Sequence, residues 1–283
     1  MISYPNVKIN LGLSVLRRRP DGYHDLETLF VPYFGIRDEL EIVEAEEFGI
    51  EVVRQVGAYG VRSDGFVPVG VPAGGFEPCP WDPMEDLTAK AWRLLKEEFG
   101  IGPVRIRLVK HSPVGAGLGG GSADGAFALR MLSDMFSLGL PDVQLAGYAA
   151  RLGSDCAFFI YNRPMFGEGR GEVLTPYDLD MSGFDIEVVV PDGISVSTAE
   201  AYRGIVPREA GGGCGPRSGS PLREALVAGP ERWRAVLVND FEATVFAAHP
   251  QLADIKASLY ERGALYASMS GSGSALFALF RHS

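Results

Sequence analysis

Hydrophobic and polar positions alternate with little error along residues 7–15. One face carries the apolar side chains of Val7, Ile9, Leu11, Leu13 and Val15. A period of two predicts a β-strand with one buried face. The opposite face includes Lys8 and Asn10. A cation and an amide side by side are unusual on a face that meets only solvent, so both are candidate functional residues.

The same analysis predicts a mixture of strands and helices along the rest of the chain. Strands are expected at 36–43, 50–53, 104–108, 186–190 and 275–280, and helices at 87–99, 122–136, 145–152, 231–238, 241–247 and 252–262. Gly and Pro predict irregular structure at 57–83, and five glycines predict a mobile loop at 210–221. The pattern predicts an α+β fold with a boundary near residue 160.

Composition narrows the classes of function. The chain has 283 residues, 46% hydrophobic and 22% charged, which suffices for a globular core. Its net charge of −10 argues against nucleic acid as a partner. Three widely spaced cysteines and no CxxC pair argue against a disulfide framework or a zinc site. Without an apolar run near ~20 residues or a signal-peptide pattern, we expect a cytoplasmic protein with no membrane partner and no obligate protein partner.

The glycine-rich segment 113–126 carries the strongest chemical signal. It reads Pro113, Val114, Gly115, Ala116, Gly117, Leu118, Gly119, Gly120, Gly121, Ser122, Ala123, Asp124, Gly125, Ala126. Glycines let successive backbone N–H groups converge on one anion. The predicted helix that follows adds its free N–H groups and the positive end of its dipole. Phosphate is therefore the expected ligand.

Other readings of this loop remain. Gly115, Gly117 and Gly120 satisfy the GxGxxG pattern of dinucleotide-binding folds. The loop begins about a hundred residues into the chain, however, and no strand ending in an acidic residue follows at the expected distance. Gly121 replaces the lysine of a Walker A loop. No HRD or DFG motif of protein kinases is present. A dinucleotide site of a nicotinamide dehydrogenase and a purely structural turn are the remaining alternatives.

Segment 113–126 resembles the ATP loop of the GHMP kinase family. Further matching segments are 7–11, 19–24, 152–155 and 270–274, in the family's order over nearly the whole chain. The resemblance implies an N-terminal ATP-binding domain of the ribosomal protein S5 domain 2-like fold, residues 1–160. It also implies a C-terminal ferredoxin-like substrate domain, residues 161–283. The substrates would meet between the two domains.

The resemblance assigns catalysis to Asp155 and Lys8. A carboxylate within hydrogen-bond reach can take the proton of an acceptor hydroxyl or orient that hydroxyl. A neighbouring lysine keeps the carboxylate ionised and offsets charge on the transferring phosphoryl group. The alternatives are that Asp155 is a simple helix N-cap and that Lys8 is solvent-exposed.

The resemblance also supplies the binding residues. ATP is expected to contact residues 113–123 together with Lys110 and Asp86, and Mg²⁺ is expected with Ser122 as a candidate ligand. Asp86 replaces the family's usual asparagine, and Ala116, Asp124 and Gly125 also depart from the common loop.

Asp21-Gly22-Tyr23-His24 points to the branch of the family that acts on a small cytidine diphosphate alcohol. An aromatic ring stacks on a base, and a directional donor or acceptor reads its edge. The expected substrate contacts are Asn10, Tyr23, His24, Thr198, Tyr202, Gly271, Ser272 and Gly273. An ordinary amphipathic-helix position is the alternative for Tyr202, and a plain turn is the alternative for 270–274. A kinase of homoserine or mevalonate, or a silent ligand sensor, remains a competing function.

Overall fold

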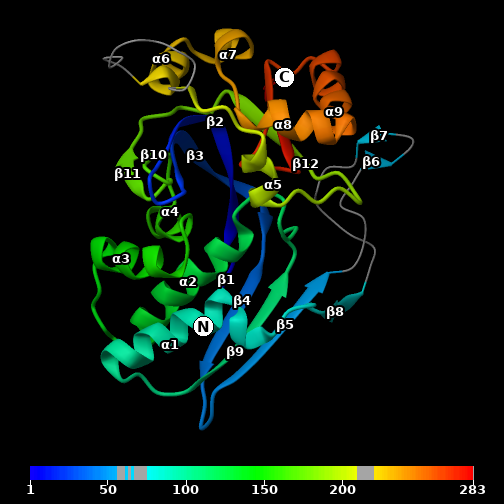
Figure 1. Ribbon diagram of the computed structural model, residues 1–283. Helices are drawn as coiled ribbons and strands as arrows, with labels where there is room; N and C mark the ends of the chain where they lie inside the picture. The colour runs from blue at the N-terminus through cyan, green and yellow to red at the C-terminus, as the bar shows by residue number, and fades with distance from the viewer. Residues whose placement is uncertain (56–60, 63–64, 67–74, 209–219, 283) are drawn as a thin grey trace.

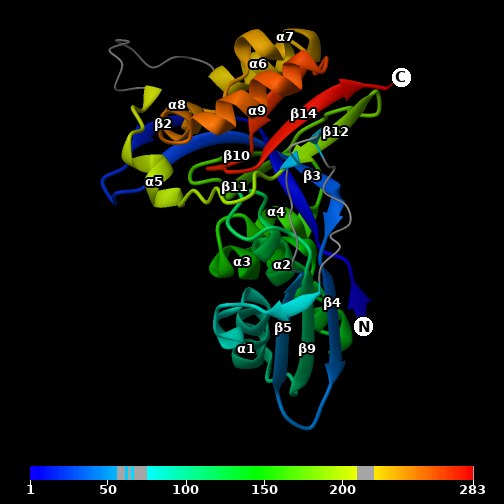
Figure 2. The ribbon, with the colours of Figure 1, turned by 90° about the vertical axis from the view of Figure 1, so that its right-hand side faces the viewer.

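The computed structural model describes residues 1–55, 61–62, 65–66, 75–208 and 220–282. It confirms the mixed α and β architecture (Figure 1). Helices cover one face of a lower sheet, and a second group of helices lies beside the sheet at the other end (Figure 2). Two long strands, β2 (Asn6–Arg18) and β3 (His24–Arg37), connect these two regions.

The lower sheet has the strand order β1-β4-β9-β5-β8. Its strands are β1 (Ile2–Ser3), β4 (Glu39–Glu44), β9 (Val104–Lys110), β5 (Gly49–Gln55) and β8 (Phe76–Pro78). Helices α1 (Leu87–Phe99), α2 (Gly120–Met135), α3 (Asp142–Leu152) and α4 (Cys156–Tyr161) build a core with it. The loop between β9 and α2 is segment 111–119, so the glycine-rich loop joins a strand to a helix as predicted.

A second sheet, β11-β10-β3-β2, adds β10 (Met165–Glu168) and β11 (Val173–Pro176) to the two long strands. The third sheet is β12-β14-β13, formed by β12 (Phe184–Val189), β14 (Leu276–Arg281) and β13 (Tyr266–Met269). The remaining elements are β6 (Val61–Arg62), β7 (Gly65–Phe66), η1 (Pro83–Glu85), α5 (Thr198–Arg203), α6 (Pro221–Val227), α7 (Pro230–Val236), α8 (Phe241–Ala248) and α9 (Pro250–Glu261). Apolar side chains of β2 pack against those of β12, β13 and β14.

Local signals account for the best predictions. Helix α1 has the predicted bounds because the Asp86 side chain accepts a hydrogen bond from Thr88 N at one end, and Gly100 adopts φ 67° at the other. Strand β2 contains the predicted segment 7–15, and its apolar positions are buried. Helix α2 begins at Gly120, two residues before the expected start, because Gly119 occupies the N-cap with φ 72°.

The single strand predicted at 36–43 is wrong. Strand β3 ends at Arg37 and β4 begins at Glu39, with Asp38 between them. The carboxylate of Asp38 is buried and accepts hydrogen bonds from His111 N and Ser112 N, each at 2.6 Å. The chain therefore changes direction around a buried carboxylate. The long strand β3 and the short helix α6 were not predicted, and α4 and α5 entered only through the alternatives for Asp155 and Tyr202.

Two predicted irregular segments fall largely on residues that the structure does not describe. In segment 57–83, the described residues form β6, β7, β8 and the start of η1. In segment 210–221, only Ser220 and Pro221 are described, and Pro221 begins α6. The loop predicted for 210–219 lies outside the described residues.

Candidate active site

The glycine-rich loop packs against the turn before β14. Gly115, Gly117 and Gly119 adopt φ of 74°, 77° and 72°. A Cβ on Gly117 would lie 2.2 Å from Ser270 O, so a side chain at this position would collide with the backbone of the turn. The Ser270 hydroxyl donates to Gly117 O at 3.0 Å. Two segments far apart in sequence are thus fixed to each other beside the site.

The loop leads into the N-terminus of α2, which has no side-chain cap. The first N–H groups of a helix lack intrahelical acceptors and attract anions. Gly119, Gly120, Gly121 and Ser122 line a cavity of about 310 Å³. Space beside Gly121 is open, since a Cβ there would meet nothing within 4 Å. The arrangement fits a phosphate chain held by backbone donors.

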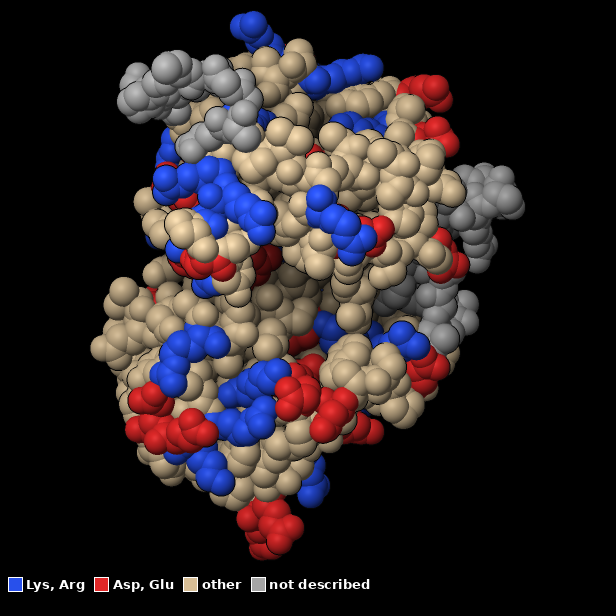
Figure 3. All heavy atoms as spheres, viewed as in Figure 1, with Lys and Arg blue, Asp and Glu red and all other residues tan. Residues whose placement is uncertain are grey.

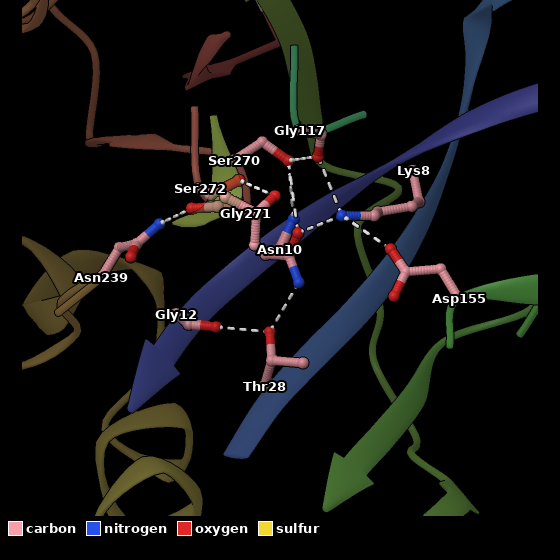
Figure 4. A network of polar contacts seen from close by, with 11 residues as sticks. Lys8, Asn10, Gly12, Thr28, Gly117, Asp155, Asn239, Ser270, Gly271 and Ser272 are labelled. Atoms are coloured by element: carbon pink, nitrogen blue, oxygen red, sulfur yellow. Dashed lines mark hydrogen bonds and ion pairs between the residues drawn. The ribbon is translucent and has the colours of Figure 1, made fainter. Parts of the chain in front are cut away.

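Lys8 and Asp155 meet beside this loop. Lys8 Nζ lies 3.4 Å from Asp155 Oδ2 and donates to Gly117 O at 2.8 Å. The Lys8 side chain is 3% exposed, whereas that of Asp155 is 30% exposed. The alternative of a solvent-exposed Lys8 is therefore wrong. Asp155 does occupy the N-cap of α4, but its side chain makes no capping hydrogen bond. Its carboxylate faces Lys8 instead (Figure 4).

A chain of hydrogen bonds orients the amide of Asn10. Asn10 Oδ1 accepts from Lys8 Nζ, and Asn10 Nδ2 donates to Thr28 Oγ1 at 2.9 Å. Thr28 in turn donates to Gly12 O at 2.8 Å. Because the threonine proton is committed to a carbonyl, its oxygen must accept, and the amide oxygen must face the lysine. Figure 4 shows this series running across β2 and β3 to Lys8.

Burial lowers the pKa of Lys8, although the nearby Asp155 carboxylate opposes the shift. An ammonium whose surroundings do not fully compensate its charge gains from a further anion nearby. The Lys8–Asp155 pair therefore combines a cation suited to a transferring phosphoryl group with a carboxylate that solvent and ligand can reach.

A larger cavity of about 810 Å³ joins these groups to the predicted substrate residues. Its lining includes Lys8, Asn10, Tyr23, His24, Gly115, Gly117, Gly119, Asp155, Thr198, Tyr202, Gly271 and Ser272. The space-filling view shows a hollow across the middle of the molecule, between the parts that carry α2 and α5 (Figure 3). Segments from both halves of the chain thus surround one cavity.

Two aromatic side chains of the cavity stack on each other, and a third lies against a cation. The rings of His24 and Tyr202 stack on each other, with centroids 4.8 Å apart and planes inclined by 17°. Tyr23 is 56% exposed and presents its ring to Arg170, 4.7 Å away. Burial, and then the charge of Arg18, lowers the pKa of His24. Its imidazole is therefore neutral at neutral pH and can both donate and accept a hydrogen bond.

Two predicted nucleotide residues do not face a cavity with their side chains. Leu118 and Ala123 are 1% and 0% exposed and pack in the hydrophobic core. Asp86 is engaged in capping α1 and also accepts from Trp81 Nε1 at 3.3 Å. Pro113, Val114 and Ala116 do line the smaller cavity, as do Asp86 and Lys110. Gly273 is absent from the described lining of either cavity, and its N–H donates to Ser270 O.

Lys110 is buried between two carboxylates, those of Asp38 and Asp124. Burial works against its charge, but these two acidic groups outweigh burial and raise the pKa of Lys110. The departure at Asp124 therefore brings no free charge to the loop, because its side chain is 1% exposed and turned to Lys110.

Sequence reasoning missed three polar groups of the site. Thr28 orients Asn10, Arg170 lines the larger cavity, and Asn239 donates to both Met269 O and Gly271 O at 2.8 Å. Arg170 carried a usable signal, since a cation between two glycines is exposed at a turn. Thr28 and Asn239 carried none, because only the paired strands bring them to the site.

No group of three or more His, Cys, Asp or Glu side chains is placed to hold a metal ion among the described residues. In the same part of the chain, no helix has the length and apolar character needed to cross a bilayer.

Comparison with known proteins agrees with this geometry. The family descriptions "GHMP kinases N terminal domain" and "GHMP kinases C terminal" match residues 86–163 and 222–283. A protein of Bacteroides thetaiotaomicron named 4-diphosphocytidyl-2-C-methyl-D-erythritol kinase is 44% identical over 99% of this chain and 92% of its own length. The chain belongs to the GHMP kinase family.

Solved structures of GHMP kinases show the same architecture. The crystal structure of a 4-(cytidine 5′-diphospho)-2C-methyl-D-erythritol kinase is 32% identical, with a TM-score of 0.75 over 99% of this chain and 90% of that one. A homoserine kinase from Cytophaga hutchinsonii is 17% identical, with a TM-score of 0.63 over 98% of this chain and 85% of that one. The second likeness shows the fold alone.

Proposed function

We propose that the protein transfers the γ-phosphoryl group of ATP to the 2-hydroxyl of 4-diphosphocytidyl-2-C-methyl-D-erythritol. This reaction belongs to the non-mevalonate (methylerythritol phosphate) pathway of isoprenoid precursor synthesis. The observation that carries the proposal is the Lys8–Asp155 pair, because it lines the same cavity as the glycine-rich loop, Tyr23 and His24. The named relatives support the choice of substrate.

We assign a role to each part of the site. Backbone donors of 115–122 hold the phosphates of ATP at the start of α2. Asp155 accepts the proton of the acceptor hydroxyl or orients it for attack. Lys8 stabilises the negative charge that spreads over the transferring group. Asn10 Oδ1 and Gly117 O accept hydrogen bonds from the Lys8 ammonium and so fix its position.

At the other end of the cavity, we assign the cytosine ring to Tyr23 and His24, with Tyr202 behind His24. Thr198 and Ser272 are additional polar contacts for the substrate, since their hydroxyls lie 3.2 Å apart on the cavity wall. Gly271 and Gly273 shape the turn that borders the loop.

The chemistry of phosphoryl transfer requires a divalent cation, for which Mg²⁺ is the ordinary choice. Ser122 fits such an ion, because it is half-buried in the first turn of α2 and lines the phosphate cavity. The ion would neutralise charge on the β- and γ-phosphates. We further propose a division into regions 1–160 and 161–283, although β10 and β11 complete a sheet of the first region. We place the enzyme in the cytoplasm, with ATP and the cytidine diphosphate alcohol as its partners.

The test is a coupled assay of ADP release with 4-diphosphocytidyl-2-C-methyl-D-erythritol, mevalonate and homoserine in parallel. Turnover is expected with the first alcohol alone. Asp155→Asn should lower kcat by about two to four orders of magnitude, because it removes the proton acceptor. ATP binding should persist, as a control for folding. Turnover of another alcohol in preference, or wild-type kcat in Asp155→Asn, would contradict the proposal.

A further inference from the structure

Arg170 occupies the tip of the hairpin between β10 and β11. It lies between Gly169 and Gly171, which adopt φ of 70° and 104°. Both glycines are in the left-handed region that side chains avoid, so the tip is a tight turn. Gly169 O accepts a hydrogen bond from Leu26 N at 2.7 Å. This bond fixes the tip to β3, two residues from His24, and so holds Arg170 at the base-binding end of the cavity.

The guanidinium group of Arg170 lies over the ring of Tyr23, 4.7 Å from its centroid, and lines the larger cavity. Its ion pair with Glu172 is long, with 4.0 Å between Arg170 Nε and Glu172 Oε1. The Glu172 carboxylate is closer to the backbone, since Arg170 N donates to Glu172 Oε2 at 2.5 Å. The side chain of Arg170 is 41% exposed. The guanidinium therefore keeps donors that can face a ligand.

The two cations of the cavity differ in how many polar partners they already contact. Lys8 and Arg170 are the lysine and the arginine among the described residues of its lining. Lys8 already faces Asn10 Oδ1, Gly117 O and Asp155. A cytidine diphosphate alcohol places an anionic diphosphate between its base and the hydroxyl that reacts. With the hydroxyl at Asp155 and the base at Tyr23, Arg170 is the arginine of this cavity's described lining that lies at the base end. Arg17, Arg18 and Arg203 line the adjoining cavity, which shares His24 and Tyr202 with this one.

We propose that Arg170 binds the diphosphate of the cytidine substrate and sets specificity for it. The planar guanidinium pairs with two phosphate oxygens at once, and its stacked position over Tyr23 is given up to the cytosine ring. Arg170 thus covers the ring of Tyr23 when no ligand is bound and contacts the diphosphate when the substrate is bound. This inference rests on the proposed function, because it takes the cytidine diphosphate alcohol as substrate.

The first experiment measures steady-state kinetics of Arg170→Ala and Arg170→Lys. Loss of a charge-assisted contact should raise KM for the cytidine substrate about 10- to 100-fold in Arg170→Ala. Arg170→Lys should recover part of this loss, since it keeps the charge without the paired donors. The values of kcat and of KM for ATP should stay within about threefold of wild type. Arg163→Ala is the matched control, because Arg163 is exposed just before β10 and lines neither described cavity.

Calorimetric binding of cytidine and of cytidine 5′-diphosphate separates contact with the anion from loss of structure. In Arg170→Ala, affinity for the diphosphate should fall about 10- to 100-fold, with cytidine affinity unchanged. Equal losses for both ligands, or no loss for either, would overturn the assignment of Arg170. Failure of the wild-type enzyme to phosphorylate the cytidine alcohol would overturn the proposed function itself. The two failures are thus told apart by the wild-type assay.

Discussion

Two buried lysines lie beside the glycine-rich loop, and their surroundings differ in one respect. Lys8 and Lys110 are each 3% exposed. Lys110 is enclosed by two carboxylates, Asp38 and Asp124, which are each 1% exposed. Lys8 has one carboxylate, Asp155, which is 30% exposed on the cavity. The partners of Lys110 are thus buried within the protein, whereas the partner of Lys8 is accessible to a ligand.

The pKa values of the two lysines shift in opposite directions for this reason. Burial lowers both, but at Lys110 the two acidic groups outweigh it and raise the pKa. At Lys8, the single carboxylate does not outweigh burial, and the pKa of the lysine falls. The burial of the counter-charge thus distinguishes a lysine that stabilises the fold, beside the 1% exposed Asp38, from one whose charge is left for a substrate, beside the 30% exposed Asp155.

Replacing Lys8 should have the largest effect on activity. Lys8→Met keeps the length of the side chain and removes the charge that faces the transferring phosphoryl group. We expect kcat to fall about 100- to 1,000-fold, the usual cost of one preorganised donor. Stability should change by less than about 1 kcal/mol, because the desolvation cost of the ammonium is removed together with its contacts. Urea unfolding and the coupled assay measure the two effects.

The pH dependence of kcat in the wild-type enzyme tests the role of the same lysine. Because burial places the pKa of Lys8 below 10.5, its ammonium loses the proton, and kcat falls, as pH rises through that lowered value. An alkaline limb below pH 10.5 is therefore expected in the wild type. Lys8→Arg, whose charge does not titrate there, should lack this limb at whatever rate it retains. Identical limbs in both proteins would assign the titration to another group.

Replacing Lys110 should instead have the largest effect on stability. Lys110→Met leaves the ionised Asp38 carboxylate buried without its cation. Breaking a buried pair from one side costs about 3–5 kcal/mol. The free energy of unfolding should fall by that amount, and kcat of the remaining folded enzyme should change less than in Lys8→Met. If both methionine variants lost equal stability, the contrast between the two lysines would be wrong.

The sequence predicted one of these lysines better than the other. Strict alternation in β2 put Lys8 and Asn10 on one face, and the family motifs placed Asp155 nearby. Lys110 was assigned to ATP, although the alternation of Val104, Ile106 and Leu108 continues to it and indicates a buried position. Its partner Asp38 lies 72 residues earlier, and only the antiparallel pairing of β4 with β9 brings them together. Local periodicity predicts on which face of a strand a side chain lies, but its interaction partner depends on the register between strands.

The same limit applies to the rest of the site. Helix α1 and the glycine loop were predicted because their signals are local, in caps and glycines. The role of Thr28 could not be predicted, since its hydrogen bonds to Asn10 and Gly12 cross between two strands. The break between β3 and β4 was missed because Asp38 is held by backbone groups of 111–112, far along the chain.

The smallest effect is expected at Asp124, the second of the two carboxyl groups beside Lys110. Burial raises the pKa of Asp124 well above its ordinary range, although Lys110 opposes the shift. For Asp38, the charge and hydrogen bond of Lys110, together with the hydrogen bonds from Ser112, outweigh burial and hold the pKa below its ordinary value. Of the two carboxyl groups, Asp38 is therefore the stronger acid and Asp124 the weaker one. Asp124→Asn should therefore be tolerated, with an unfolding free energy within about 1 kcal/mol of wild type near pH 4.

The pH dependence of that difference is the sharper measurement. As pH rises above about 4, Asp124 of the unfolded chain loses its proton while the folded protein retains it, so this group destabilises the wild type progressively. Asp124→Asn does not titrate, and its stability relative to wild type should increase between pH 4 and pH 7. For Asp38→Asn, the stability relative to wild type should instead decrease as pH rises above about 4. A carboxylate with a lowered pKa contributes stability in that range, and the variant lacks it. A constant difference for Asp124→Asn across this range would show that both carboxylates are ionised around Lys110.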